Sequence, residues 1–550
     1  SISLNIELKA DEEKTISFTL GSSYNDKENY DLVKKYSELN NCLSELKKVK
    51  RFWKDTLEKI QIETIDKSFD YVINGWYLYQ TISSRIFAKA SFSKTIGILN
   101  YKELLEDAMN LVTINEEFTR NQILENSKHQ FVEGEVLHWW NEKNHYGLRS
   151  RFKDDYLWLI YTVIHYIKIT NDYSILNEKT PYVIGENLSD YEIEKGIIFN
   201  YSENKDTILN HCLKSLELAI TSLGSNKLPL FGSGDSNELM TKVGVKGKGE
   251  SAFLGFFIYN IINEFSNIIK KANKNIDYSS FLEFNTKLKE NLNKKAWDGD
   301  YFIRAIFDNG DKLGSTESSE CKIDLLSQSF AIISEVANKE QIKSILTSVE
   351  DELVDNNIKV IKDFTMPFKK SLNIPGKIMN YPEKFSNNGG QTTKYTSFYL
   401  LALIKVGYYD RAYQYFQMIN PINRSDKKEK IDKYQIEPYV LSENISAAEA
   451  FLGQGSFSWL TGAASWFYRI GIEEILGFHK NGNILKLEPK IPIAWDNFKL
   501  TYKYLNTTYK IEVIKSEKEA LEIDGKNQIS NKIELTNDKK VHKIKLFIKK

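Results

Sequence analysis

The chain has 550 residues, of which 41% are apolar, so it can bury a large core in more than one domain. Lys plus Arg and Asp plus Glu both number 74, so the formal net charge is zero and the basic excess typical of nucleic-acid-binding proteins is missing. Cys42, Cys212 and Cys321 lie far apart, without metal or disulfide spacing, which predicts buried thiols in a reducing compartment, the cytoplasm.

Aromatic residues reach 13% of the chain, with 31 Tyr and 30 Phe, a richness that suits a carbohydrate-binding cleft. The sequence shows no signal peptide and no apolar run of membrane-spanning length, so we predict no membrane association. The chain begins at Ser1 directly in a strand-like pattern, which is typical of a fragment or a processed piece of a longer protein.

The N-terminal part changes from a strand-like to a helical pattern. Residues 2–20 alternate apolar and polar side chains around a turn at 10–13, which predicts a hairpin or two strands of a sheet. Residues 27–60 are charged and carry apolar side chains at helical spacing. We interpret them as a pair of linker helices.

Helical patterns then fill the chain from about residue 66 to 475. The predicted helices cover about 69–82, 101–112, 114–127, 154–169, 208–220, 251–272, 280–294, 323–336, 340–347, 393–406, 408–418 and 461–475. About twelve helices joined by alternating short and long loops are the pattern of an (α/α)6 toroid, and another helical array is the alternative. After Gly477 the pattern becomes short alternating strands over 484–550, which predicts a small C-terminal β-domain.

The stretch 227–256 joins an apolar entry to a glycine-rich polar turn. Gly232 and Gly234 permit backbone conformations that a β-carbon would block, and the carboxylates of Asp235 and Glu238 follow. An acid held on such a turn beside aromatic segments can form the floor of a sugar site. The alternative is a surface loop whose Asp and Asn side chains make local turn hydrogen bonds.

Four further polar and aromatic loops interrupt the helices, at 129–158, 315–330, 387–394 and 436–466. In the first, Trp faces can stack on sugar rings, while carboxylates and Arg can hydrogen-bond hydroxyl groups. The alternative there is a helix start capped by Asp154 with an Arg–Asp ion pair, and we expect His138 to be a hydrogen-bonded structural side chain. No P-loop, dinucleotide fingerprint or zinc spacing is present, so no metal site is predicted.

These motifs occur together in the order of a known family. The segments FVEGEVLHWW, LRSRFKDDYLWL, GSGDSNELM, NNGGQTTK, IEPYV and GSFSWLTGAASWFYRIGIEEILGF resemble glycoside hydrolase family 94. That family comprises inverting disaccharide and oligosaccharide phosphorylases and the C-terminal region of cyclic β-1,2-glucan synthases. The resemblance implies a mainly α protein with the end of an N-terminal β-sandwich at 1–24, a helical linker at 25–62, an (α/α)6 catalytic-type barrel at 63–477 and a C-terminal β-domain at 478–550. Most of the family's N-terminal domain has no counterpart here.

The resemblance also implies a reaction. One carboxylic acid protonates the glycosidic oxygen of a β-linked gluco-oligosaccharide while inorganic phosphate attacks the anomeric carbon from the opposite face. The product is an α-sugar 1-phosphate. Phosphate is then a co-substrate, no cofactor is expected, and the partners are an oligosaccharide or a sugar phosphate. A homodimer and an association with the missing N-terminal region are both left open.

Carried over by motif, the proton donor is Glu238, which stands where the family has Asp, and Asp235 is the alternative donor. The phosphate-binding positions are Gly390, Thr461 and Lys394, the last in place of a family His. The positions implied for substrate binding are Lys102, Asp107, Trp139, Arg151, Asp155, Ser236, Glu437 and Tyr439. Lys102 replaces a fork-shaped Arg of the family's sugar clamp, and Ser236 replaces a Trp.

Because scaffold motifs are kept while chemical positions are altered, three interpretations compete. The first is an active phosphorylase, and the second is a catalytically inactive relative that binds glycans or serves a structural role. The third is an inverting hydrolase, which needs a second carboxylate as its base. Glu443 and Glu449 are candidates for that base, the alternative being solvated surface carboxylates.

Overall fold

The computed structural model of the chain describes residues 3–23, 25–90, 97–189, 192–272 and 276–549, which form two compact units, 1–60 and 61–550. In the first unit, α1 (Asp26–Tyr36) and α2 (Leu39–Leu57) confirm the helix pair predicted at 27–60. The Asn25 side chain caps α1 by accepting a hydrogen bond from the Glu28 amide.

The hairpin predicted at 2–20 is wrong. Within the described residues 3–23 the structure has a turn at Ala10 and Asp11 but no strand. Alternation of apolar and polar side chains produces a stable strand only where further strands or a helix cover its apolar face. The interpretation of 1–24 as the end of a sandwich stays a prediction.

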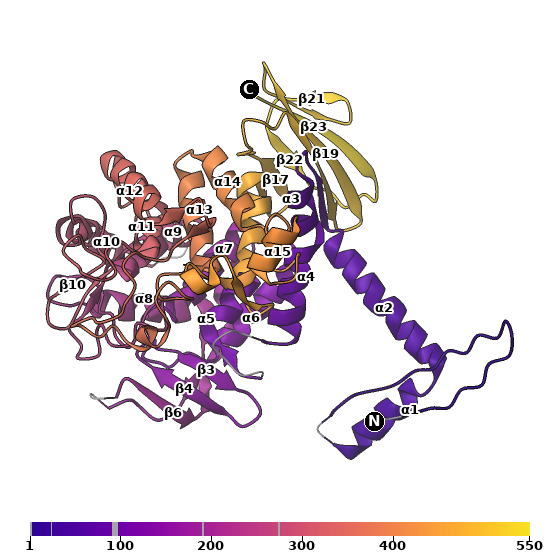
Figure 1. Cartoon of the computed structure of the whole chain (residues 1–550), viewed down its shortest axis with the longest axis horizontal. Helices are drawn as coiled ribbons and strands as arrows, with labels where there is room; N and C mark the ends of the chain where they lie inside the picture. Colours follow the sequence, from indigo (N-terminus) through magenta and orange to yellow (C-terminus); the bar gives the residue numbers. More distant parts are fainter. Residues whose placement is uncertain (1–2, 24, 91–96, 190–191, 273–275, 550) are drawn as a thin grey trace. The chain divides into compact units, whose positions relative to one another are not determined.

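The second unit is mainly helical. Helices make up 41% of the structure, which confirms the mainly α class. Its helices are α3 (Lys67–Tyr71), α4 (Tyr77–Gln80), α5 (Tyr101–Asn110), α6 (Glu116–Ser127), α7 (Leu157–Thr170), α8 (Ile208–Thr221), α9 (Ala252–Lys271), α10 (Ser279–Asn291), α11 (Leu325–Ile333), α12 (Lys339–Glu352), α13 (Thr393–Lys405), α14 (Tyr409–Ile419), α15 (Lys428–Tyr434) and α16 (Ala463–Arg469), as Figure 1 shows.

Helix α9 lies at the core of the second unit. By length and composition alone it could cross a membrane, so the prediction that no apolar run of that length exists is wrong. However, 67% of its apolar window is buried inside the protein, where Phe253, Phe256 and Phe257 are fully enclosed. Such burial is what a core helix of a folded domain shows.

Two wide helical segments flank α4, and a third continues α16. They are the π-helical segments η1 (Val72–Trp76), η2 (Thr81–Phe87) and η7 (Ile470–Ile475). Single π-turns inside helices are frequent at functional sites. Here η2 carries Arg85, whose role is described below.

Small antiparallel sheets connect the helices. They use β2 (Leu99–Asn100), β3 (Leu137–Asn141), β4 (Tyr146–Ser150), β5 (Lys179–Ile184), β6 (Glu194–Ile198), β7 (Asn200–Thr207), β8 (Glu250–Ser251), β9 (Ala305–Ile306), β10 (Lys312–Leu313), β11 (Val354–Asp355), β12 (Val360–Ile361), β13 (Gln391–Thr392), β14 (Ser442–Ile445) and β15 (Gly455–Ser458). One sheet has the order β2-β3-β4-β6 and another β13-β14-β15. Both bring residues from distant parts of the sequence together.

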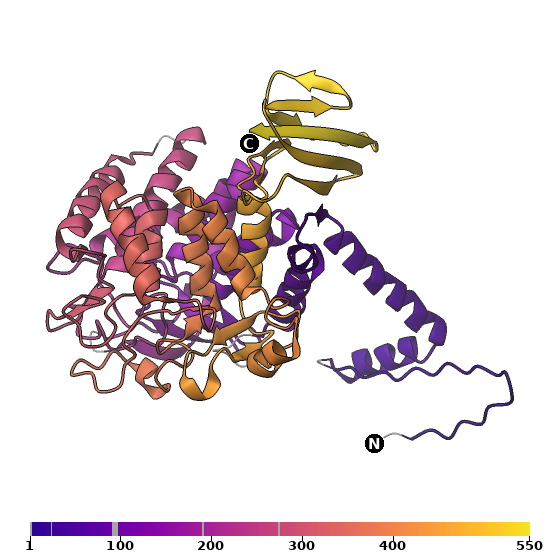
Figure 2. The same cartoon turned by 45° about the horizontal axis from the view of Figure 1, so that its top comes forward.

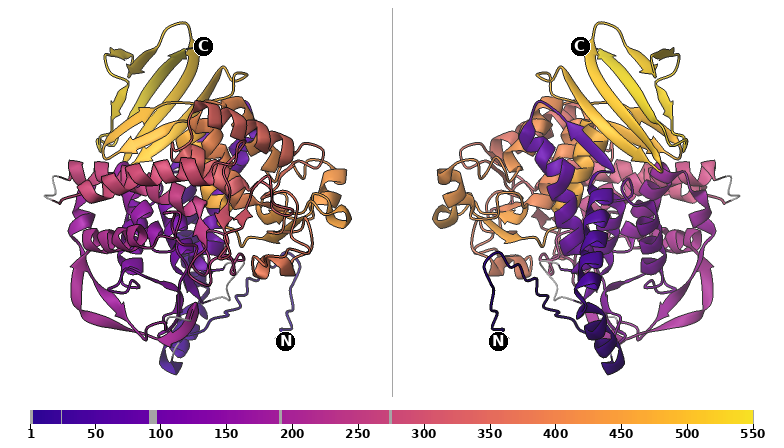
Figure 3. Two further views of the ribbon diagram at one scale, coloured as in Figure 1. Left: turned by 90° about the vertical axis from the view of Figure 1, so that its left-hand side faces the viewer. Right: turned by 90° about the vertical axis from the view of Figure 1, so that its right-hand side faces the viewer.

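The predicted C-terminal strands are present. They are β16 (Phe478–Asn481), β17 (Ile484–Leu487), β18 (Asn497–Tyr504), β19 (Thr507–Ser516), β20 (Ala520–Ile523), β21 (Lys526–Gln528), β22 (Lys532–Glu534) and β23 (Val541–Lys549). The larger sheet runs β1-β18-β19-β23-β20-β21, where residues 61–63 of β1 (Ile60–Glu63) begin the second unit and β19 and β23 are parallel. Figure 2 shows these strands gathered on one side of the helices, and Figure 3 shows them at the opposite end from β3, β4 and β6.

Candidate functional site

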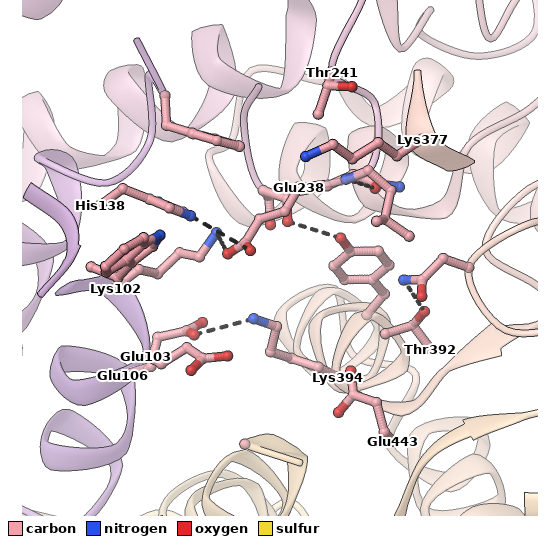
Figure 4. A pocket seen from close by; sticks show the side chains of 18 of the residues that line it. Lys102, Glu103, Glu106, His138, Glu238, Thr241, Lys377, Thr392, Lys394 and Glu443 are labelled. Carbon is pink, nitrogen blue, oxygen red and sulfur yellow. Dashed lines mark hydrogen bonds and ion pairs between the residues drawn. The ribbon is translucent and has the colours of Figure 1, made fainter. Parts of the chain in front are cut away.

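A cavity of about 450 Å³ opens in the second unit. The charged or titratable side chains that line it are Arg85, Lys102, Glu103, Glu106, His138, Glu194, Glu238, Lys377, Lys394, Tyr395 and Glu443. Figure 4 shows ten of its lining residues labelled. Five of the residues predicted to bind substrate or phosphate or to donate the proton line this cavity, namely Lys102, Trp139, Ser236, Glu238 and Lys394, and so does the candidate base Glu443. The predicted proton donor and the predicted phosphate-binding cation therefore share one site.

The loop that carries Glu238 is held from below by a buried ion pair. Arg304 donates from Nη1 to Asp235 Oδ2 at 2.7 Å and from Nη2 to Asp235 Oδ1, and both side chains are fully enclosed. The Ser251 hydroxyl also donates to Asp235 Oδ2, at 2.8 Å. These bonds fix the Asp235 carboxylate beneath the loop, so Asp235 orients the loop, whereas Glu238 lines the cavity and Asp235 does not.

Gly234 has a steric reason to be glycine. A β-carbon there would lie 2.2 Å from the Phe152 ring, and the backbone of Phe152 forms isolated β-bridges with Gly232 and Gly234. Phe152 in turn stacks on His138 with ring centroids 4.4 Å apart. The loop therefore sits directly against the end of the sheet that carries His138 and Trp139 on β3.

Glu238 faces two basic side chains. Lys102 Nζ lies 3.3 Å from Glu238 Oε1, and His138 Nε2 lies 3.8 Å from Glu238 Oε2. The other ring nitrogen of His138 donates to Asp155 Oδ2 at 2.7 Å, which sets the orientation of the ring. Asp155, predicted to bind substrate, thus does not line the cavity but positions His138. His138, expected to be a structural side chain, lies in the cavity beside Glu238.

Lys102 is shared between two carboxylates. Its Nζ also lies 3.2 Å from Asp154 Oδ2, and only 1% of its side chain is exposed. Burial by itself would lower the pKa of Lys102, but the neighbouring Asp154 and Glu238 outweigh it and hold that pKa well above its usual range. Burial raises the pKa of Asp154 to about 6 against the opposing effect of Lys102.

Helix α5 supplies several cavity residues because of its periodicity. Lys102, Glu103 and Glu106 lie on one side of its first two turns, and Asn100 caps it through the Glu103 amide. Glu106 Oε2 lies 3.1 Å from Lys394 Nζ, at the start of α13. The predicted phosphate-binding cation is therefore already paired with a carboxylate.

Arg85 is a cavity residue that the sequence interpretation missed. Its Nε donates to Asp107 Oδ2 at 2.9 Å, and its Nη2 lies 3.4 Å from Glu103 Oε2. Burial raises the pKa of Asp107 to about 6, although Arg85 opposes the shift. Asp107, predicted to bind substrate, does not line the cavity and instead positions Arg85.

Glu443 brings a further carboxylate into the cavity from β14. Burial raises its pKa, whereas the Thr461 hydroxyl, which donates to it, and the charges of Lys394 and Arg85 oppose the shift. Thr461 is fully buried and its Oγ1 also accepts the Ala463 amide at 2.9 Å. It lies behind the cavity wall, between the lining residues Leu460 and Gly462.

Four further predicted residues, in addition to Asp235, Asp155, Asp107 and Thr461, do not line the cavity. Arg151 donates to the carbonyls of Glu192 and Ser189, both at 2.8 Å, so its guanidinium supports a surface loop. Glu437 accepts from Trp459 Nε1 at 2.9 Å, and Tyr439 stacks on Trp76 with centroids 4.0 Å apart. Gly390 forms a tight turn, since a β-carbon there would lie 2.5 Å from the Ser386 carbonyl.

A second cluster of metal-ligand types lies away from the cavity. Ligand atoms of Glu125, His129 and Glu142 all lie within 4.8 Å of one another. Lys128 pairs with Glu125 at 2.5 Å, and His129 Nε2 lies 3.0 Å from Glu142 Oε1. These side chains therefore contact one another and Lys128, and the expectation that no metal is needed stays a prediction.

Comparison with known proteins gives a consistent family. The family model of the glycosyl hydrolase 94 superfamily, catalytic domain, matches residues 52–477. Cyclic beta-(1,2)-glucan synthase NdvB of Rhizobium meliloti (strain 1021) is 32% identical over 94% of this chain and 18% of that protein. N,N'-diacetylchitobiose phosphorylase of Vibrio proteolyticus is 25% identical over 93% of this chain and 64% of that protein. Solabiose phosphorylase of Paenibacillus borealis is 24% identical over 89% of this chain and 60% of that protein.

The chain thus spans less than two thirds of the length of these curated relatives. Among solved structures, the GH78 family rhamnosidase of Bacillus SP. GL1 aligns with 83% of this chain and 42% of that chain. The TM-score is 0.55 and the sequence identity 11%. At that identity the likeness concerns the fold alone.

Proposed function

Because the chain belongs to the glycosyl hydrolase 94 superfamily, we propose that its cavity cleaves or forms β-glucosidic bonds with inversion, with Glu238 as the proton-transferring group. The observation that carries this proposal is that Glu238 and Lys394 line the same cavity. The family and the helical pattern also support an (α/α)6 toroid as the scaffold. Cytoplasmic location and the absence of nucleic-acid and membrane partners are further expectations, and a homodimer or an association with an N-terminal region are the two alternatives for assembly.

We propose inorganic phosphate as the nucleophile, since relatives of this chain are named as phosphorylases. Cleavage breaks the bond between the anomeric carbon and the glycosidic oxygen, and Glu238 gives that oxygen a proton. Phosphate attacks from the opposite face, and an α-sugar 1-phosphate results. Arg85 and Lys394 are the cations that we assign to phosphate: Arg85 Nη1 donates at 3.2 Å to the carbonyl of Leu460, which precedes Thr461, and Lys394 lines the same cavity.

Lys102 has a consequence for the direction of assay. Its ammonium group lies 3.3 Å from Glu238 Oε1 and so places a positive charge directly beside the carboxylate that synthesis would use. By microscopic reversibility, the group that donates a proton in cleavage accepts one from the acceptor hydroxyl in synthesis. The ionised form is the one that synthesis needs, so synthesis from an α-sugar 1-phosphate is the more sensitive direction for a first assay.

The test is phosphate release from α-glucose 1-phosphate with a panel of acceptor sugars. Glu238→Gln keeps the shape but removes the proton-transferring group, so we expect a loss of rate of about 10²- to 10⁴-fold in a protein that still unfolds cooperatively. Glu449→Gln, an exposed carboxylate in η6 (Glu449–Phe451), is the matched control and should keep full activity. If the wild-type protein releases no phosphate with any acceptor of the panel, the proposal is contradicted.

A second candidate is a glycan-binding module without catalysis. One observation favours it. Lys102 stands where the family has Arg, and its single ammonium group lies beside Glu238 and Asp154. It therefore lacks the planar guanidinium that can donate two parallel hydrogen bonds to a sugar. Under this proposal, calorimetry detects saccharide binding, while wild type and Glu238→Gln show the same absence of turnover.

A further inference from the structure

The two side chains expected to hold phosphate already face carboxylates. Lys394 Nζ lies 3.1 Å from Glu106 Oε2, and the Thr461 hydroxyl donates to Glu443. Inorganic phosphate carries between one and two negative charges at neutral pH. Its entry would place it beside Glu106 and Glu443, where like charges repel more strongly than in water because the cavity is partly desolvated.

Water carries no such penalty. We propose that the cavity also hydrolyses its β-glucoside, with Glu443 as the base that activates a water molecule. This inference rests on the proposed function, because Glu238 must still serve as the proton donor. It adds an activity that needs no phosphate.

The backbone around Glu443 is well fixed. Strand β14 pairs with β13 through Asn444 and Thr392, and with β15 through Ser442 and Ser458. The neighbouring Asn444 is buried and its side-chain oxygen lies 3.0 Å from the Ser386 hydroxyl, which donates to it. A base for an inverting hydrolase needs such a rigid mount, because the water that it orients must lie in line with the breaking bond.

The surroundings of Glu443 suit a proton acceptor. It faces Thr461, Lys394, Arg85 and Glu103, of which the first three favour its ionised form and the last opposes it. Burial raises its pKa above the ordinary value, which strengthens it as a base, while the charges of Lys394 and Arg85 oppose that shift. These opposing effects are the balance that a general base requires.

The two carboxylates enter the cavity from different segments. Figure 4 shows Glu238 and Glu443 on different sides of the Lys394 side chain. Inverting hydrolases hold their acid and base about 6.5–9.5 Å apart to leave room for a water molecule. The cavity volume of about 450 Å³ exceeds by far the ~30 Å³ that one water occupies in the liquid.

The step balances without any further reactant. Glu443 takes a proton from water, whose oxygen bonds to the anomeric carbon from the face opposite to the leaving group. The bond from that carbon to the glycosidic oxygen breaks, and Glu238 protonates the oxygen. A β-glucoside gives an α-configured sugar and an alcohol. A proton then returns from Glu443 to Glu238 through solvent.

The experiment uses the full chain in phosphate-free buffer with a panel of β-linked glucose disaccharides. We expect free glucose, with the α-anomer formed first as seen by NMR. Glu443→Gln should lower this hydrolysis about 10²-fold or more, because it cannot accept the proton. In calorimetry the same variant should bind inorganic phosphate about tenfold tighter than wild type, because one negative charge is removed.

The controls separate the two proposals. Glu238→Gln should lose both phosphorolysis and hydrolysis, whereas Glu449→Gln should keep both. Phosphate-dependent turnover without any hydrolysis would overturn this inference and leave the proposed function standing, and inactivity in both assays would overturn both. Unchanged hydrolysis or unchanged phosphate affinity in Glu443→Gln would exclude Glu443 as the base. Glu443→Asp keeps the negative charge and should therefore keep the wild-type phosphate affinity. This variant shows whether an effect of Glu443→Gln comes from the lost charge or from a folding defect.

Discussion

The ammonium group of Lys102 is buried between Asp154 and Glu238, at 3.2 and 3.3 Å. A buried cation that serves two carboxylates compensates the desolvation of both, so its removal leaves uncompensated negative charge. The family's Arg at this position would span more acceptors with its planar fork. The shorter reach of the Lys102 ammonium group confines its ion pairs to Glu238, the proposed donor, and Asp154.

Replacing Lys102 by Met should destabilise the protein in a pH-dependent way. At pH 7 we expect a loss of about 3–5 kcal/mol in the free energy of unfolding, as is typical when one partner of a buried ion pair is removed. Asp154, whose pKa lies at about 6 even with Lys102 present, becomes protonated at pH 5, so the loss should shrink there. Urea unfolding at both pH values measures it. Lys242→Met, at an exposed cation, is the control. If Lys102→Met loses the same free energy of unfolding at pH 7 and at pH 5, the argument is contradicted.

Single residues of the site were predictable in part. Glu238, Trp139 and Lys394 line the cavity as their motifs implied, because each motif has a recognisable order along the chain. Arg85 was missed because nothing near it in sequence marks it: its partners Asp107 and Leu460 are 22 and 375 residues away. Glu443 could not be told from a solvated surface carboxylate, since only the pairing of β14 turns it into the cavity.

Helix α8 carries a histidine whose protonation is opposed by its position. His211 is fully buried, with Nδ1 2.7 Å from Gln130 Oε1 and Nε2 3.0 Å from Thr180 Oγ1. Burial lowers its pKa from the ordinary value of 6.5 to about 4. Between pH 6.5 and 4 the unfolded chain therefore binds more protons at this residue than the folded one, so acidification weakens the fold.

His211→Gln should remove this dependence. Wild type should lose about 2–3 kcal/mol more than the variant in the free energy of unfolding between pH 7 and 4.5, at 1.36 kcal/mol per pKa unit. The difference between the two proteins is the quantity to measure, because Asp107 and Asp154, with pKa values raised to about 6, act in the opposite direction in both. His145→Gln, at an exposed position, is the control. Parallel pH profiles of wild type and His211→Gln would refute the argument.

The helices were well predicted and the small sheets were not. Helical periodicity over ten or more residues located α5, α8, α9 and α13 within a few residues. Strands such as β3 and β4 have five residues each, and their pairing depends on partners elsewhere in the chain, so the segment 129–158 was interpreted as a loop. The strands predicted at 2–20 also depended on partners. The alternation of apolar and polar side chains there does not produce a strand, because no further strand or helix in the described part of the chain covers the apolar face.

At the scale of the whole molecule, the two units differ in how much they bury. Neither α1 nor α2 contains a buried residue, whereas α9 buries twelve. Segments that bury little apolar surface open with little free energy, so proteases reach them first.

Limited trypsin digestion should therefore cut first within residues 1–60, at basic residues such as Lys34, Lys47 and Arg51. The expected product is a resistant fragment that begins near residue 61, identified by mass spectrometry. Its thermal unfolding should match that of the main transition of the intact chain. First cuts within the described part of 61–550 would contradict this division of stability.

The walls of the cavity come from residues as far apart as Arg85 and Gly462. A molecule that occupies it therefore binds only when nearly the entire second unit is folded. Such binding raises the free energy of unfolding, and with it the melting temperature, by an amount that depends on the affinity. A ligand present at 100 times its dissociation constant adds about 2.7 kcal/mol to the folded state. Screening sugars, sugar phosphates and inorganic phosphate by melting temperature can thus rank what this site accepts before any turnover is known.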